Sequence, residues 1–248
     1  MLKKLLCLLL VWSTSIHAQS LRVAVAANAQ FVMESLSDAF QKQTGVTIEP
    51  IVSSSGKLTT QIQQGAPFDV FLSADMDYPN ALHKQGLTTT APTVYAYGSL
   101  VLWTLGNLPI SADLKVLQNS AVRHIAIANP ALAPYGQAAM SLLKYRNLVE
   151  TTKAKLVYGE SISQVNQYIL SGAAEVGITA KSVVLDPSLK QRGRWVDLPP
   201  PGYSPIAQGV VVLKRSSQAK TAQQFVQFLR SSTARRIIQQ YGYRFPTS

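Results

Sequence analysis

Small and polar residues stand at four points where an expected strand ends and an expected helix begins. These turns lie at residues 27–28, 53–56, 133–136 and 161–162. The first N–H groups of a helix have no partner inside it, and the helix dipole places positive potential behind them. One such turn is a common anion site, and four brought together would hold a small oxyanion with uncharged donors. We therefore expect an anion-binding site built from strand-to-helix turns.

The second of these turns contains three successive serines, residues 53–55, followed by Gly56. One serine is enough to cap a helix, so the others leave spare hydroxyl groups, and glycine lets the backbone approach a ligand closely. A polar turn without a ligand is the alternative interpretation. We take Ser54 and Ser55 as candidate donors to an anion.

The other three turns each offer one candidate donor beside a plainer interpretation. Asn28 follows an apolar strand and is either a ligand or an ordinary N-cap. Tyr135 has a phenolic hydroxyl between a proline and a glycine, and packing is its alternative role. Ser161 and Gln164 have the spacing of a capping box, which leaves the N–H of Ile162 without a helical partner. Because all four turns follow the C-terminal ends of strands, where α/β sheets bind ligands, we expect them to converge.

The chemistry of these donors predicts which ligands the site accepts. They are hydroxyl and N–H groups, without an arginine clamp. Each donor left unpaired costs about 1–3 kcal/mol, so several together separate an unprotonated anion from one that presents an O–H group. This pattern favours a compact inorganic dianion, while another oxyanion, a carboxylate or an organic phosphate stays open.

Ser54 and Lys57 also fit the pattern S-x-x-K of penicillin-binding enzymes, so a serine hydrolase is the competing hypothesis. The partner motifs S-D-N and K-T-G are missing, as are a G-x-S-x-G elbow, a phosphate-binding loop and a dinucleotide fingerprint. His83 and His124 have no metal-ligand spacing, and we expect His124 to be packed in a strand. We therefore expect a protein that is not an enzyme and uses no cofactor.

Apolar strands alternate with amphipathic helices along the chain, which is the pattern of a parallel sheet with crossover helices. Strands are expected at residues 21–26, 46–52, 69–73, 95–105, 124–128, 155–158, 175–179 and 209–213. Helices are expected at 57–64, 137–145 and 162–171, directly after three of the turns, and two amphipathic helices finish the chain. The expected fold class is α/β.

Two β-rich passages, residues 95–105 and 200–213, divide this alternation into two halves. Such passages indicate a chain that crosses to a second lobe and returns. We expect lobe 1 to comprise residues 19–97 and 206–248, and lobe 2 to comprise residues 98–205. The ligand would then bind in the cleft between the lobes.

Residues 1–18 have the character of a secretory signal peptide. Two lysines precede an apolar run at 5–12, and Ile16-His17-Ala18 is a plausible cleavage site. The apolar run is too short to cross a bilayer. Cys7 is the only cysteine of the sequence, so the mature chain is expected to have no disulfide and no cysteine metal site. We expect a periplasmic location.

Basic residues outnumber acidic ones, 23 to 12, which gives a formal net charge of +11. Such a charge raises the rate of encounter with anions, although a merely solvated basic surface is the plainer interpretation. The lysines and arginines are scattered and are not interleaved with aromatic residues. We therefore expect no nucleic-acid partner.

Five segments give the chain a specific likeness to one family. They are residues 23–28 (VAVAAN), 53–56 (SSSG), 65–75 (GAPFDVFLSAD), 128–136 (ANPALAPYG) and 177–179 (GIT), of which the third is the most specific. Over essentially its whole mature length, the chain resembles the periplasmic molybdate-binding proteins of ABC transporters, the ModA family.

This resemblance implies a two-lobed, type II periplasmic-binding-protein fold that closes over molybdate or tungstate. It implies a monomeric receptor that serves an ABC transporter permease in the inner membrane. Many members have serine where this chain has Asn28, and a ligand tyrosine where it has Ala180, so Tyr135 is expected to replace that tyrosine. By the same resemblance, the residues that hold the oxyanion are Ala27, Asn28, Ser54, Ser55, Tyr135 and Ile162.

Overall fold

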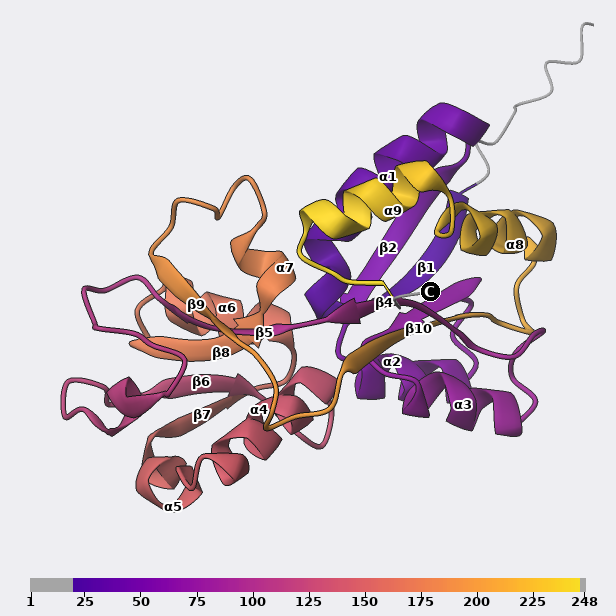
Figure 1. Cartoon of the computed structure of the whole chain (residues 1–248). Coiled ribbons are helices and arrows are strands. Elements are labelled where there is room, and N and C mark those ends of the chain that lie inside the picture. Colours follow the sequence, from indigo (N-terminus) through magenta and orange to yellow (C-terminus); the bar gives the residue numbers. More distant parts are fainter. Residues whose placement is uncertain (1–19, 246–248) are drawn as a thin grey trace, which may run out of the picture.

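The structure is a computed structural model that describes residues 20–245, so the expected signal peptide at residues 1–18 lies outside the described residues. Its strands form two five-stranded sheets, with the orders β2-β1-β3-β10-β4 and β7-β6-β8-β5-β9 (Figure 1). We call the half built on the first sheet lobe 1 and the half built on the second sheet lobe 2. The expected two-lobed α/β fold is confirmed.

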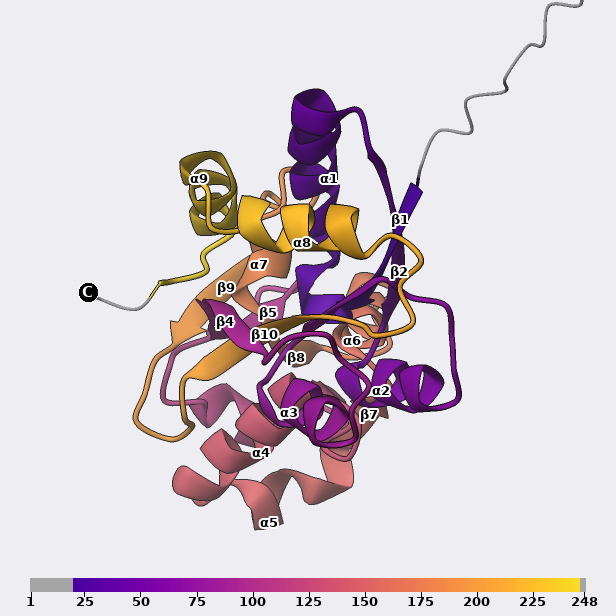
Figure 2. The ribbon, with the colours of Figure 1, turned by 90° about the vertical axis from the view of Figure 1, so that its right-hand side faces the viewer.

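Lobe 1 has a mixed sheet with helices on both faces. Its strands are β1 (Ser20–Ala26), β2 (Thr47–Ser53), β3 (Val70–Ser73), β4 (Thr93–Gly98) and β10 (Ile206–Val212). The first three are parallel, and β10 runs antiparallel to β3 and β4. One face is covered by α1 (Gln30–Thr44), α8 (Ala219–Phe228) and α9 (Ser232–Gln240), and the other by α2 (Ser55–Gln63) and α3 (Asp77–Lys84) (Figures 1 and 2). A short 3₁₀ helix, η1 (Ala27–Ala29), joins β1 to α1.

Lobe 2 repeats this arrangement with other strands. These are β5 (Leu100–Thr104), β6 (Ile125–Ala128), β7 (Leu156–Gly159), β8 (Val176–Ala180) and β9 (Arg194–Leu198). Here β7, β6 and β8 are parallel, and β5 runs antiparallel to β8 and β9. Its helices are α4 (Pro134–Tyr145), α5 (Val149–Thr152), α6 (Ile162–Leu170) and α7 (Lys181–Val184), with 3₁₀ turns η2 (Lys115–Gln118) and η3 (Lys153–Lys155).

The strand expected at residues 95–105 is divided at Ser99 between the two lobes. Its first part, β4, pairs with β10 of lobe 1, whereas its second part, β5, pairs with β8 and β9 of lobe 2. The chain returns to lobe 1 through residues 199–205, between β9 and β10. A periodicity of two cannot reveal such a division, because side chains alternate in the same way whichever strand is the neighbour.

Apolar burial holds each lobe together and continues between the lobes. Alternate residues of β1 enter the two faces of the lobe 1 sheet, with Val23 under α1 and α8 and Ala24 facing α2. The core of lobe 2 also includes three small residues of lobe 1, namely Ala26, Ala27 and Ala74. The lobes are therefore in contact around the C-terminal ends of β1 and β3. Among residues 20–245, no helix is both long and apolar enough to span a membrane.

Candidate functional site

A small pocket lined by buried residues lies between the lobes at the C-terminal ends of their parallel strands. Its volume, including its open side, is about 190 Å³, below the roughly 300–1,000 Å³ of pockets for drug-sized ligands. None of the six candidate ligand residues is more than 4% exposed. The residues that line the pocket are Ala26, Ala27, Asn28, Ser54, Ser55, Ala74, Ala133, Pro134, Tyr135 and Ile162, so it contains all six. It has room for a small ion.

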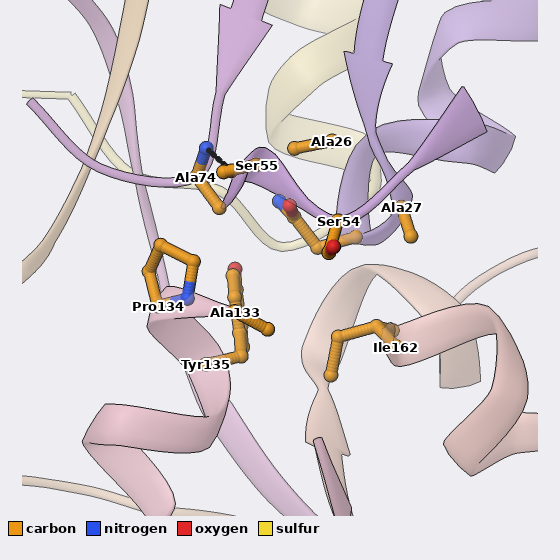
Figure 3. Close-up of a pocket in the computed structure, with 10 residues that line it drawn as sticks. Ala26, Ala27, Ser54, Ser55, Ala74, Ala133, Pro134, Tyr135 and Ile162 are labelled. Atoms are coloured by element: carbon orange, nitrogen blue, oxygen red, sulfur yellow. Dashed lines mark hydrogen bonds between the residues drawn. The ribbon is translucent and has the colours of Figure 1, made fainter. Parts of the chain in front are cut away.

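Each lobe contributes two strand-to-helix turns to this pocket. In lobe 1, Asn28 follows β1 and Ser55 follows β2; in lobe 2, Tyr135 lies beyond β6 and Ile162 beyond β7. Figure 3 shows the serine turn opposite Tyr135 and Ile162, with the pocket between them. The structure thus brings together the four turns that the sequence placed apart.

The serine turn has one capping serine and one serine that faces the pocket. Ser54 is the N-cap of α2, and its Oγ accepts a hydrogen bond from the N–H of Lys57 at 3.4 Å. Ser55 begins the helix, and its Oγ accepts from the N–H of Ala74 at 3.0 Å (Figure 3). That bond uses the oxygen as an acceptor, so the hydroxyl proton of Ser55 remains available to a ligand. The expected start of this helix at Lys57 is two residues late, because Ser54 already supplies the cap.

Tyr135 lies in the first turn of α4, since the helix begins at Pro134 and not at residue 137 as expected. Burial raises the pKa of its hydroxyl well above the ordinary value of 10, with nearby tyrosines adding to the rise and a hydrogen bond with Asn28 opposing it. The hydroxyl therefore keeps its proton at neutral pH. A Cβ at Gly98 would lie 1.9 Å from this hydroxyl oxygen, so glycine is required at that position for Tyr135 to occupy its place.

Ile162 offers a backbone donor rather than a side chain. It is the first residue of α6, so its N–H has no acceptor inside the helix. Ser161 caps this helix, with its Oγ accepting from the N–H of Gln164 at 3.5 Å, as the spacing predicted. In a capping box the side chain of Gln164 would accept from the N–H of Ser161. Here its Oε1 accepts from the N–H of Glu160 instead, at 2.6 Å.

Asn28 is not the ordinary N-cap that the sequence allowed. It lies within η1, and its Nδ2 donates to the Oε1 of Gln208 at 2.7 Å and to the hydroxyl of Tyr243 at 2.9 Å. Sequence reasoning missed both partners. A glutamine inside the apolar strand β10 was a signal for Gln208, whereas nothing in the sequence marked Tyr243.

Hydrogen bonds across the cleft hold the lobes closed around the pocket. The N–H of Gly56 in lobe 1 donates to the carbonyl of Leu132 in lobe 2 at 2.9 Å. The Oγ of Ser182, in lobe 2, donates to the carbonyl of Asn28 at 2.6 Å. At the exposed rim, Lys57 forms an ion pair with Glu160. A ligand in this pocket would therefore be enclosed by both lobes.

The electrostatics of the pocket come from dipoles. Among the described residues that line it, none carries a charge. Lys57 is directed toward Glu160, and only its backbone N–H contacts the hydroxyl of Ser54. The lysine amine and the serine hydroxyl that a serine hydrolase would need are thus engaged with different partners.

Two further titratable residues, Asp75 and His124, do not line the pocket. Asp75 accepts a hydrogen bond from the N–H of Tyr78 in the first turn of α3. The expectation that His124 is packed in a strand is wrong, because β6 begins at Ile125 and the side chain of His124 is 49% exposed. Within residues 20–245, no cluster of three or more His, Cys, Asp or Glu side chains is placed to hold a metal ion.

Two lobes closed over a small pocket of neutral donors define a solute-binding protein, and the comparisons agree. The family described as "Bacterial extracellular solute-binding protein" matches residues 21–244. The molybdate-binding protein ModA of Azotobacter vinelandii is 39% identical over 228 residues, which are 92% of this chain and 90% of that protein. ModA of Rhodobacter capsulatus is 38% identical over 89% of this chain and 86% of its own length.

Solved structures give the same result. The periplasmic molybdate-binding protein of Azotobacter vinelandii superimposes with a TM-score of 0.87 at 35% identity, covering 92% of this chain and all of the other. The sulfate-binding protein SubI of Mycobacterium tuberculosis shares the fold, with a TM-score of 0.77 at 17% identity over 91% of this chain and 86% of its own. The chain therefore belongs to the bacterial extracellular solute-binding proteins and, within them, to the ModA family of molybdate-binding proteins.

Proposed function

We propose that this protein is a periplasmic receptor that captures molybdate and tungstate and delivers them to an ABC importer in the inner membrane. One observation carries the proposal: six buried residues from both lobes line one small pocket without a charged side chain. Donors that belong to both lobes bind best when the lobes are closed, so the oxyanion would stabilise the closed form. The receptor performs no covalent chemistry and needs no cofactor.

The choice of a dianion follows from the donors. The hydroxyls of Ser55 and Tyr135, and the helix-opening N–H groups of Asn28 and Ile162, all present hydrogen atoms to the ligand. A protonated oxyanion such as phosphate would place an O–H group against one of these donors and lose that bond. Sulfate has no proton but is a smaller tetrahedron, so we expect it to contact the donors of both lobes less well than molybdate does.

The wider assignment rests on the family and the sequence. We propose that residues 1–18 direct export, that residues 19–97 and 206–248 form lobe 1, and that residues 98–205 form lobe 2. The receptor would act as a monomer with a permease as its partner, and without nucleic acid.

Isothermal titration calorimetry with molybdate, tungstate, sulfate and phosphate tests the proposal. We expect molybdate and tungstate to bind with similar affinity, and sulfate and phosphate to bind at least about 100-fold more weakly, which is about 2.7 kcal/mol. Absence of heat with molybdate, or equal binding of sulfate, would contradict the proposal. Labelling with a fluorophosphonate tests the hydrolase hypothesis, and we expect no adduct on Ser54.

A further inference from the structure

Asn28 is held by a buried network that reaches far beyond the pocket. Its Nδ2 donates to Gln208 and to Tyr243, and its carbonyl accepts from the hydroxyl of Tyr243 at 2.9 Å and from the Oγ of Ser182 at 2.6 Å. Gln208 is fully buried, and Asn28 and Tyr243 are 1% and 4% exposed. Tyr243 therefore binds both polar ends of Asn28, its side-chain amide and its backbone carbonyl.

Gln208 fixes the orientation of the Asn28 side-chain amide. The Nε2 of Gln208 donates to the carbonyls of Ile206 at 2.9 Å and Ala74 at 3.2 Å. Since those carbonyls can only accept, the Oε1 of Gln208 is left to face Asn28, and Asn28 must present its Nδ2. The orientation of the Asn28 amide is thus set by backbone groups on two strand ends.

Gln208 also reaches the second donor turn of lobe 1. The residue whose carbonyl it binds, Ala74, donates its N–H to the Oγ of Ser55 at 3.0 Å. One glutamine is therefore linked to both lobe 1 donor turns, to Asn28 directly and to Ser55 through Ala74. Both turns line the pocket, whereas Gln208 and Tyr243 are not among the residues that line it.

We infer that Gln208 and Tyr243 are positioning residues that set the affinity and selectivity of the anion site by fixing the donor turns of lobe 1. The inference rests on the proposed function. A donor held by a fixed backbone binds an anion without losing conformational freedom, which favours affinity. A fixed donor also cannot move toward a tetrahedral anion that is too small, which favours selectivity. Removing either side chain therefore weakens molybdate binding and reduces the preference for molybdate over sulfate.

Tyr243→Phe is the first test, because it removes one oxygen atom and keeps the ring. Burial raises the pKa of Tyr243 to about 12, so the wild-type hydroxyl is protonated during the assay. We expect molybdate to bind about 10-fold more weakly and the ratio of molybdate to sulfate affinity to fall. The measurement is calorimetry with both anions, beside thermal unfolding without ligand.

Tyr241→Phe is the matched control. Tyr241 is 8% exposed and lies two residues away, but its hydroxyl contacts the Oγ of Ser35 at 3.0 Å and donates to the Oδ2 of Asp186 at 3.5 Å, and it does not contact Asn28. We expect this variant to lose a similar amount of thermal stability and to bind molybdate within twofold of the wild type. The inference is overturned if Tyr243→Phe also binds within twofold, or if the control weakens binding equally.

A double-mutant cycle shows whether Gln208 acts through Asn28. Gln208→Leu and Asn28→Ala are each expected to weaken molybdate binding, and the double variant to lose less than the sum of the two effects. Fully additive losses would overturn the role of Gln208. If Gln208→Leu does not fold, the comparison of Tyr243→Phe with Tyr241→Phe decides the inference. A wild-type protein that does not bind molybdate would reject the proposed function as well, whereas normal wild-type binding with unchanged variants rejects this inference alone.

Discussion

The two lobes have the same strand order but fix their donor turns in different ways. In both, the first and second parallel strands lead into the turns that line the pocket, and a strand from elsewhere in the chain runs antiparallel beside the third. Lobe 1 holds its turns by side-chain hydrogen bonds, which the Nδ2 of Asn28 donates to Gln208 and Tyr243 and the N–H of Ala74 donates to the Oγ of Ser55. Lobe 2 relies on Pro134 at the start of α4 and on the cap of α6.

This difference shows that the strand order decides where the turns lie, whereas the surrounding residues decide how each turn is held. The shared strand order brings four helix N-termini to one place, whatever residues stand there. The residues then decide how firmly each donor is held and what a mutation costs. A polar network loses both binding and stability when it is cut, whereas a single hydroxyl on an apolar turn loses binding alone.

The largest effect is expected for Ser55→Ala in lobe 1. It removes a donor to the anion and leaves the buried N–H of Ala74 without its acceptor. We expect about 100-fold weaker molybdate binding and a loss of about 1–2 kcal/mol in the free energy of unfolding. If Ser55 served the ligand alone, its replacement would leave stability unchanged. Urea unfolding therefore tests whether the bond from Ala74 contributes to stability.

Ser54→Ala is the comparison variant for that experiment. Loss of the N-cap is expected to lower stability by about 1 kcal/mol while changing molybdate affinity much less than Ser55→Ala does. Equal losses of affinity in the two variants would remove the distinction between the capping serine and the serine that faces the pocket.

A smaller effect is expected where lobe 2 depends on one hydroxyl. Tyr135→Phe should weaken molybdate binding about 10-fold with little change in stability. Gly98→Ala should weaken it at least as much, because the new Cβ would lie 1.9 Å from the Tyr135 hydroxyl oxygen. Calorimetry measures both, and Gly106→Ala, with its nearest contact at 3.7 Å, is the control. A Gly98→Ala protein that binds normally would show that Tyr135 does not need its present place.

The turns that follow β3 in lobe 1 and β8 in lobe 2 differ in charge. The acidic residue in the first, Asp75, predicts that the stability of the protein depends on pH. Asp75 follows β3, and its pKa is raised to about 6, first by burial and then by Asp77, against hydrogen bonds from Tyr78 and Ser73. Because the folded pKa lies above the unfolded value near 3.8, stability falls as pH rises through this interval. Asp75→Asn should therefore stabilise the protein at pH 7.5, by about 1–3 kcal/mol.

At pH 4 the same substitution should have little effect, since the wild-type carboxyl is then protonated in the folded protein. Urea unfolding at the two pH values measures the difference. An equal gain at both would show that the charge of Asp75 is not the cause. In lobe 2 the strand β8 is followed directly by Lys181, which pairs with Asp197 at 2.9 Å.

The smallest effect is expected at the rim, where Lys57 and Glu160 join the lobes. Both side chains are well exposed, at 40% and 63%, so solvent screens their attraction. Lys57→Gln should raise the rate of molybdate release by no more than about threefold, and this change should vanish in high salt. Stopped-flow release measures it, with Lys153→Gln, which breaks an ion pair inside lobe 2, as the charge-matched control.

The sequence by itself determined the α/β class, the four donor turns and the cap at Ser161. Ser54 and Ser161 cap α2 and α6 in the structure, and both helices lead out of candidate turns. These features are local, since a cap, the first turn of a helix and the strand before it lie within a few residues of one another. The residues of these turns were therefore identified before their positions in space were known.

The tertiary structure alone decided what holds the donors and where the long β-rich passage divides. The partners of Asn28 are 180 and 215 residues away along the chain, and Gly98 meets Tyr135 only after the chain has crossed between the lobes. The error on His124 is local instead, because β6 begins one residue later and leaves this side chain exposed. Hydrogen bonds and burial between distant segments depend on how the two sheets come together, and no local pattern of residues encodes that arrangement.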